Sequence, residues 1–155
     1  DKIASATSLC RWNTDMYGVD PSKEGATYYD SIFQLYASWG VDFVKVDDIC
    51  NTNATADPYS AEKEIELIRK AIDTCGRDMV LSLSPGPAVI EKAWHLRQNA
   101  NMWRITDDFW DQWDLLLEMF WRCEVWERQS PGCWPDCDML PIVSQAASPP
   151  TAKAV

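Results

Sequence analysis

The sequence predicts an α/β fold in which parallel strands are joined by helices. Four helical segments alternate with four short strand segments, and this alternation is typical of parallel strands with crossover helices. Pairs of Asp residues follow three of the strands, so they would meet at one edge of the sheet. The chain has 155 residues, 46% of them hydrophobic, which suits one domain with a buried core. The alternation alone fits both a (β/α) barrel and an open doubly wound sheet.

The first half of the chain supplies two helices and a strand. Residues 1–20 read as irregular and polar. Apolar residues three and four apart predict a helix over 21–40, with Pro at its start and Gly at its stop. Residues 41–46 are rich in Val and predict a strand. The turn-rich loop 51–59 then leads into a helix over 60–76, with Ser60 able to cap it and Gly76 at its end. Its apolar residues Ala61, Ile65, Ile68 and Ile72 share one face.

The second half repeats the alternation. Residues 79–84 predict a strand that a Pro-Gly-Pro turn stops, and residues 88–98 predict a helix. A short strand is expected over 102–106. A long helix over about 110–127 follows, predicted by the helical spacing of Trp113, Leu116, Leu117 and Phe120. Residues 133–140 read as a strand end with a loop. The chain contains no G-x-G-x-x-G motif and no phosphate loop, so a nucleotide site is not supported.

Charge excludes two classes of partner. The chain carries 24 acidic and 14 basic residues and a formal net charge of −10. Nucleic-acid binding requires a basic footprint, and anionic membranes attract basic segments. No apolar run approaches the roughly 20 residues of a membrane-spanning helix. We therefore expect neither nucleic acid nor a membrane as a partner.

The acidic pairs at the strand ends carry the strongest chemical signal. They are Asp47/Asp48, Asp107/Asp108 and Asp136/Asp138. A single Asp in a loop more often caps a helix. Three pairs at one sheet edge indicate a site, because α/β enzymes build their sites where parallel strands end.

Basic residues lie near two of these carboxylates. Lys45 and Asp47 are two apart in a strand and share a face, so the lysine would keep Asp47 ionised. Arg104 and Asp108 form a second such pair across a strand end. Glycoside hydrolysis requires two carboxylates with different neighbours, one charged and one carrying a proton. A purely structural ion pair is the alternative at each position.

Tryptophan adds a weaker indication of sugar binding, because aromatic faces pack against the apolar faces of sugars. Core packing explains most of the nine Trp residues, Trp113 and Trp121 among them. The Trp residues that flank the acidic clusters are better candidates to line a site. They are Trp39, Trp103 and Trp134.

Other site types have less support. His95, the only histidine, lies on a predicted helix and is expected to be structural, since the helices of a barrel form its outer ring. No second His supports a Ser-His-Asp triad. A metal site that uses Asp47, Asp136 and Asp138 stays open as an alternative, because oxygen ligands suit Ca²⁺ or Mg²⁺.

Three segments resemble motifs of glycoside hydrolase family 27, which contains α-galactosidases and α-N-acetylgalactosaminidases. Residues 39–47 (WGVDFVKVD) resemble the family's W-G-V-D-x-x-K-x-D segment. Residues 103–113 resemble its W-R-x-x-x-D-x-x-D-x-W segment. Residues 134–140 resemble W-x-D-P-D-M-L, with Cys137 where Pro is usual. The resemblance covers about residues 10–140.

The resemblance implies a (β/α)8 barrel and retaining hydrolysis of a terminal α-galactoside-like residue. Asp47 falls at the family's nucleophile and Asp108 at its general acid/base, with carboxyl groups expected about 5 Å apart. Lys45, Arg104 and Asp138 match positions that hold the sugar. No metal and no organic cofactor is implied, and the partner is a carbohydrate.

Three further implications concern the surroundings of the nucleophile. Ser84 falls where the galactosidases carry a Glu that binds the sugar's 2-hydroxyl and where the N-acetylgalactosaminidases carry a Ser, so the identity of the sugar stays open. Trp134 is expected to contact substrate. Cys10 and Cys50 correspond to a family disulfide, and an extracytoplasmic location follows from the resemblance alone.

A complete barrel of this type needs roughly 250 residues. The motifs match strands four to seven only, so we expect residues 1–143 to form a partial catalytic domain and residues 144–155 to be a disordered tail. A half barrel leaves strand edges unpaired. We therefore expect a fragment that is weakly stable or self-associating and has little activity alone. A non-catalytic, vestigial half barrel that at most binds sugar is the alternative.

Overall fold

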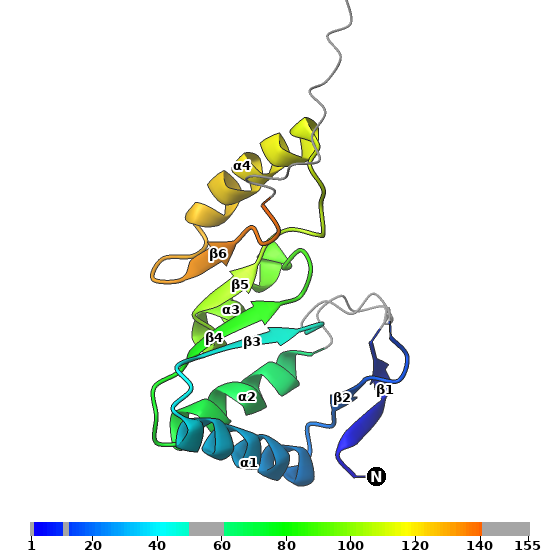
Figure 1. The fold of residues 1–155 in the computed structure, drawn as a ribbon, viewed down its shortest axis with the longest axis vertical. Coiled ribbons are helices and arrows are strands. Elements are labelled where there is room, and N and C mark those ends of the chain that lie inside the picture. Colours follow the sequence, from blue (N-terminus) through cyan, green and yellow to red (C-terminus); the bar gives the residue numbers. More distant parts are fainter. Residues whose placement is uncertain (1, 11–12, 50–60, 141–155) are drawn as a thin grey trace, which may run out of the picture.

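The computed structural model describes residues 2–10, 13–49 and 61–140. Two sheets are present in these ranges, a two-stranded antiparallel sheet and a four-stranded parallel sheet (Figure 1). Within them, no helix has the length and apolar character needed to cross a membrane. The expected tail, 144–155, lies outside the described residues, so its disorder stays a prediction.

The four parallel strands follow one another in space as they do in sequence. They are β3 (Phe43–Asp47), β4 (Val80–Ser84), β5 (Met102–Arg104) and β6 (Trp134–Asp136). Their arrowheads point the same way in Figure 1, and a helix connects each strand to the next. In a doubly wound sheet the order of the strands across the sheet reverses at a switch point. The four described strands instead follow one another across the sheet without a reversal, as they do in the wall of a barrel.

Helices precede and separate these strands, as predicted. They are α1 (Lys23–Trp39), α2 (Glu62–Thr74), α3 (Ala93–Asn99), which follows the 3₁₀ turn η1 (Ile90–Lys92), and α4 (Trp113–Glu127). The stop at Gly40 is confirmed, because this residue has a φ of 77° and donates to carbonyls of the last turn of α1. Ser22 caps the start of α1 by accepting from the Gly25 amide. The expected cap of α2, Ser60, lies outside the described residues, and Ala61 occupies the N-cap position.

The prediction that residues 1–20 are irregular is wrong. They contain an antiparallel pair, β1 (Ala4–Leu9) with β2 (Tyr17–Val19). Small and polar residues dominate β1, so the strand lacks the apolar alternation that would have revealed it. Glu64 of α2 links β2 to α1. Its carboxylate accepts hydrogen bonds from the Val19 amide of β2 at 2.9 Å and from the Tyr29 hydroxyl of α1 at 2.5 Å. Burial raises the pKa of Glu64 above its ordinary value.

The core lies between the parallel sheet and helices α2 to α4. Leu81, Leu83 and Trp103 point to this side of the sheet and are fully buried. The predicted apolar face of α2 is confirmed, since Ile65 and Ile68 are fully buried against them. The ring of Trp126, in α4, contacts the ring of Trp103 edge to face, with ring centroids 5.8 Å apart.

Helix α4 departs from the expected burial. Trp113 is 67% exposed and Trp121 60% exposed, so core packing does not explain these two residues. The helix turns other positions, Met119 and Trp126, toward the core. The apolar face that the sequence pattern identified is therefore an exposed face within the described part of the chain.

Two tryptophans expected near the acidic clusters lie elsewhere. Trp103 sits in the core because neighbouring strand residues alternate in direction, which puts Trp103 and Arg104 on opposite faces. Trp39 ends α1 and precedes the amino end of β3, away from the strand ends that carry the carboxylates.

Leu83→Ala should lower the free energy of unfolding by about 3 kcal/mol, because it leaves a cavity where a fully buried side chain was. Leu35→Ala, at a position of α1 that is 46% exposed, is the matched control and should cost less than about 0.5 kcal/mol. Urea unfolding of the two variants checks this, and equal losses would contradict the assigned core.

Candidate active site

Side chains on one face of the parallel sheet form two rows, all polar except Met102 and Trp134. Residues paired across parallel strands share a face, so the register identifies the members of each row. The row at the carboxyl ends is Asp47, Ser84, Arg104 and Asp136, and the row before it is Lys45, Ser82, Met102 and Trp134. The opposite face carries the buried core. The sheet thus separates an apolar helix side from a polar side.

Lys45 joins the first strand of the sheet to the segment after the last. Its ammonium lies 3.4 Å from a carboxylate oxygen of Asp138 and 3.6 Å from one of Asp136. Asp47 was the expected partner of Lys45, but these two carboxylates are the ion-pair partners observed. Four strands in a flat sheet would place β3 and β6 roughly 14 Å apart. This contact agrees with a sheet that curves as a barrel wall does, with this face concave.

Arg104 is the buried centre of the charge network. Its guanidinium is 2.6 Å from Asp108 and 3.2 Å from Asp138, and the residue is 7% exposed. The predicted pair of Arg104 with Asp108 is confirmed. A buried guanidinium needs such partners, because an unpaired charge in this position would be costly. Arg104 thus fixes two of the predicted site carboxylates to the end of β5.

Asp138 is held by charges and by its own backbone. Burial alone would raise its pKa, but the hydrogen bond at the Met139 amide and the charges of Arg104 and Lys45 outweigh it and hold the pKa below the ordinary value. The Asp138 amide also donates to Asp136 at 2.8 Å. Asp138 and Met139 have φ values of 46° and 29°, an uncommon conformation for residues with side chains. The network holds this tight segment in place.

The predicted nucleophile and general acid/base lie at the same edge of the sheet, at the ends of β3 and β5, with β4 between these strands. Asp47 ends β3 and is exposed, and it pairs in register with Ser84, which is 4% exposed. Asp108 follows β5 and its side chain is 60% exposed. Trp134 lies on the same face, two residues before Asp136, and is 63% exposed. Their catalytic and sugar-binding roles stay predictions.

Cys10 lies at the end of β1 and is 5% exposed. Its expected disulfide partner, Cys50, lies outside the described residues, so this disulfide stays a prediction. Cys10 lines a cavity of about 260 Å³ together with Asp47 and Glu64. Sequence reasoning missed Glu64, because nothing in its helical pattern shows that a hairpin amide and a tyrosine would converge on it.

One cluster in the described ranges has the side chains to hold a metal ion. Ligand atoms of Glu62, Glu66 and His95 lie within 4.8 Å of one another. His95 is buried between α2 and α3 and contacts Glu66 at 3.3 Å, which agrees with the structural role expected for it. Lys92 already places an ammonium 3.2 Å from Glu62. This cluster is thus partnered within the protein.

The alternative metal site at Asp47, Asp136 and Asp138 does not agree with the structure. The Lys45 ammonium contacts both Asp136 and Asp138, and it supplies the positive charge that a metal ion would bring. A divalent cation there would lie against this ammonium and against the guanidinium of Arg104.

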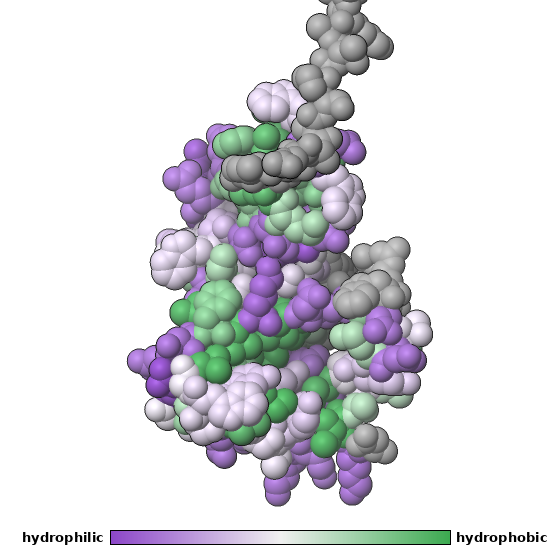
Figure 2. All heavy atoms as spheres, viewed as in Figure 1, coloured by the Kyte–Doolittle hydropathy of each residue, from purple (hydrophilic) through white to green (hydrophobic). Residues whose placement is uncertain are grey.

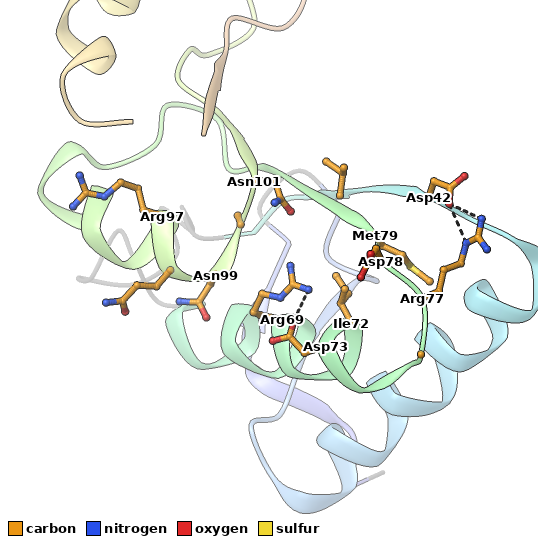
Figure 3. A pocket seen from close by; sticks show the side chains of 14 residues that line it. Asp42, Arg69, Ile72, Asp73, Arg77, Asp78, Met79, Arg97, Asn99 and Asn101 are labelled. Atoms are coloured by element: carbon orange, nitrogen blue, oxygen red, sulfur yellow. Dashed lines mark hydrogen bonds and ion pairs between the residues drawn. The ribbon is translucent and has the colours of Figure 1, made fainter. Parts of the chain in front are cut away.

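A cavity of about 810 Å³ lies at the other end of the strands (Figure 3). Arg77 and Asp42 form an ion pair at one side of it, with 2.6 Å between their atoms, and Arg69 pairs with Asp73. Met79 and Asp78 place it at the amino end of β4. Barrel enzymes act at the carboxyl ends of their strands, so size alone does not make this cavity a candidate active site.

Comparison with known proteins gives consistent matches. The family model described as Alpha galactosidase A matches residues 15–152. Alpha-galactosidase A of Cellvibrio japonicus is 31% identical over 128 residues, which are 82% of this chain and 26% of that protein. Alpha-galactosidase A of Homo sapiens is 32% identical over 124 residues, covering 74% of this chain and 28% of that protein.

A solved structure resembles the chain more strongly. It is Abp-WT, a GH27-b-L-arabinopyranosidase from Geobacillus stearothermophilus, at 57% identity and a TM-score of 0.82. The match covers 91% of this chain and 32% of that one. The chain therefore spans about a third of this structure's length and about a quarter of the curated relatives named above.

Asp138→Asn should lower the unfolding free energy by about 2 kcal/mol at pH 7, because it removes a charged partner of buried Arg104. The folded-state pKa of Asp138 is lowered, so the ionised form stabilises the fold above the ordinary value of 3.8. The difference between wild type and variant should therefore shrink as pH falls through the lowered folded-state pKa. Denaturant unfolding from pH 2.5 to 7 measures it.

The matched control for that series is Asp15→Asn, at an exposed carboxylate in the turn between β1 and β2. It should change the unfolding free energy by less than about 0.5 kcal/mol at every pH. A pH-independent loss in Asp138→Asn would show that the ion pairs do not stabilise the fold.

Proposed function

Because the chain belongs to the Alpha galactosidase A family, glycoside hydrolase family 27, we propose that the full-length protein is a retaining glycoside hydrolase. The observation that carries the proposal is the charge network at the carboxyl edge of the sheet. Lys45 and Arg104 converge there on Asp138, and Arg104 also binds Asp108. A row of charged groups on the concave face is suited to bind the hydroxyls of one sugar.

The proposed reaction uses two carboxylates in turn. Asp47 attacks the anomeric carbon while Asp108 gives a proton to the leaving oxygen, which forms a covalent sugar–enzyme ester and releases the aglycone. Asp108 then takes a proton from water, which attacks the same carbon and frees Asp47. The 60% exposure of the Asp108 side chain supports its part, since a leaving oxygen and the water of the second step can both reach it. The sequence implies no cofactor for either step.

The substrate we favour is a terminal β-L-arabinopyranoside, with an α-D-galactoside second. The solved structure at 57% identity has the first activity in its title, and the relatives near 30% identity have the second in their names. The two sugars share the configuration of the pyranose ring and differ in the hydroxymethyl group of galactose. Ser84, buried beside Asp47, and the exposed ring of Trp134 are proposed to contact the sugar with Lys45.

The direct test compares p-nitrophenyl β-L-arabinopyranoside and p-nitrophenyl α-D-galactopyranoside with the full-length protein. Asp47→Asn should lower kcat/KM by at least about 1,000-fold, because the amide cannot act as a nucleophile. Asp114→Asn, at an exposed position in the first turn of α4, is the matched control and should keep the wild-type rate. A protein inactive on both substrates would favour the non-catalytic, sugar-binding alternative.

The role of Asp108 is tested through the leaving group. Asp108→Asn should slow hydrolysis of an alkyl glycoside by about 1,000-fold, because its leaving oxygen needs a proton. A dinitrophenyl glycoside of the same sugar needs none, so its bond cleavage should slow far less. Equal losses on the two substrates would contradict the assignment of Asp108 as the acid.

We further propose that the isolated chain associates with itself. Phe43 and Val80, at the amino ends of β3 and β4, are 51% and 37% exposed, and Trp113 and Phe120 expose further apolar surface on α4. Figure 2 shows hydrophobic residues exposed over β3 and β4 beside hydrophilic ones. Sedimentation of the purified 155-residue chain should give species larger than a monomer. A monomer with a cooperative thermal transition would contradict this.

A further inference from the structure

Two cysteines meet behind the charge network. Cys123 lies in α4, and Cys137 is the residue directly after β6. Their sulfur atoms are 3.1 Å apart, although the residues are 14 positions apart in sequence. Both side chains are half-buried and pack against the core. We propose that Cys123 and Cys137 form a disulfide that fixes the segment carrying Asp136 and Asp138.

The contacts of the two sulfurs favour this pairing over others. Closing the gap to the roughly 2.05 Å of a disulfide requires a shift of about 1 Å, which side-chain rotation can supply. Cys133, the nearest cysteine in sequence to Cys137, directs its sulfur to the Ala100 carbonyl at 3.7 Å. Cys75 directs its sulfur to backbone carbonyls near the end of α2. Among the described residues, no group of potential metal ligands includes either Cys123 or Cys137.

The location of Cys137 gives the bond a consequence. It lies between the two carboxylates that hold Lys45, and its carbonyl accepts from the buried Thr106 hydroxyl at 2.6 Å. Asp138 and Met139, which follow it, have positive φ values. This backbone conformation is unfavourable for residues with side chains, so it depends on the contacts that hold the segment. A covalent bond from Cys137 to α4 restrains this segment from its helix side, opposite the ion pairs.

The bond forms by thiol–disulfide exchange with a small-molecule disulfide such as oxidised glutathione. The Cys123 sulfur attacks the reagent and releases one thiol, and Cys137 then attacks the Cys123 sulfur and releases the second. Two protein thiols are oxidised and one reagent disulfide is reduced to two thiols. Burial, Cys123 and Asp136 raise the pKa of Cys137 to about 12, so little thiolate is present at neutral pH. The exchange should therefore be slow near pH 7 and faster as pH rises.

The first test is peptide mapping of the full-length protein. The protein is equilibrated at pH 8 with oxidised glutathione, or with dithiothreitol, and then alkylated and digested. Oxidation should produce a linked Cys123/Cys137 peptide and raise Tm by a few degrees relative to the reduced protein. Both effects should vanish in Cys123→Ser and in Cys137→Ser. The matched control, Cys133→Ser, should keep them.

Two results would overturn the disulfide. One is alkylation of both thiols after oxidation, and the other is a linked peptide that contains Cys133 instead. Neither readout uses catalysis, so failure here is distinguishable from failure of the proposed hydrolase.

The second test concerns the segment and rests on the proposed function. Reduction should raise KM by about threefold or more and leave kcat within about twofold, because Asp138 is assigned to sugar binding rather than to bond cleavage. Cys123→Ser should show the raised KM in both redox states. A protein with the mapped disulfide but the same KM in both states would overturn the inference that the bond fixes this segment.

Discussion

The ion pair between Lys45 and the two carboxylates after β6 constrains the whole arrangement. It joins the first and last of four neighbouring strands, which a flat sheet would hold roughly 14 Å apart. This contact agrees with a barrel wall that curves toward the side bearing the charges, with its helices outside. In such a wall, polar groups from separate strand ends face one another across a binding site.

Arg104 couples two carboxylates of the charge network. It is 7% exposed, and its guanidinium binds Asp108 and Asp138 at once, so the positions of these carboxylates depend on each other. Asp138 is 25% exposed and paired twice, whereas the side chain of Asp108 is 60% exposed. One carboxylate is thus held in a fixed position, and the other is open to an approaching ligand. Environment, rather than residue type, separates the two roles.

The sequence predicted the parts of the structure that depend on local pattern. The helix ended by Gly40, the apolar face around Ile65 and the strand ending in Asp47 all follow from spacing and turn residues. The partner of Lys45 could not be predicted, because it depends on the curvature of a four-stranded sheet. The expectation that Trp103 lines the site rested on its closeness to Asp107 in sequence, whereas the alternation of the strand turns Trp103 toward the core. Strand β1 was missed because its sequence has no alternation of apolar and polar residues.

The most direct test of this account is a crystal structure of the full-length protein with a sugar bound. The account predicts that the carboxyl groups of Asp47 and Asp108 lie about 5 Å apart on opposite sides of the anomeric carbon, as a retaining mechanism requires. Lys45 should still contact Asp138. A separation of about 9 Å, or side chains on opposite faces of the sheet, would contradict the retaining hydrolase.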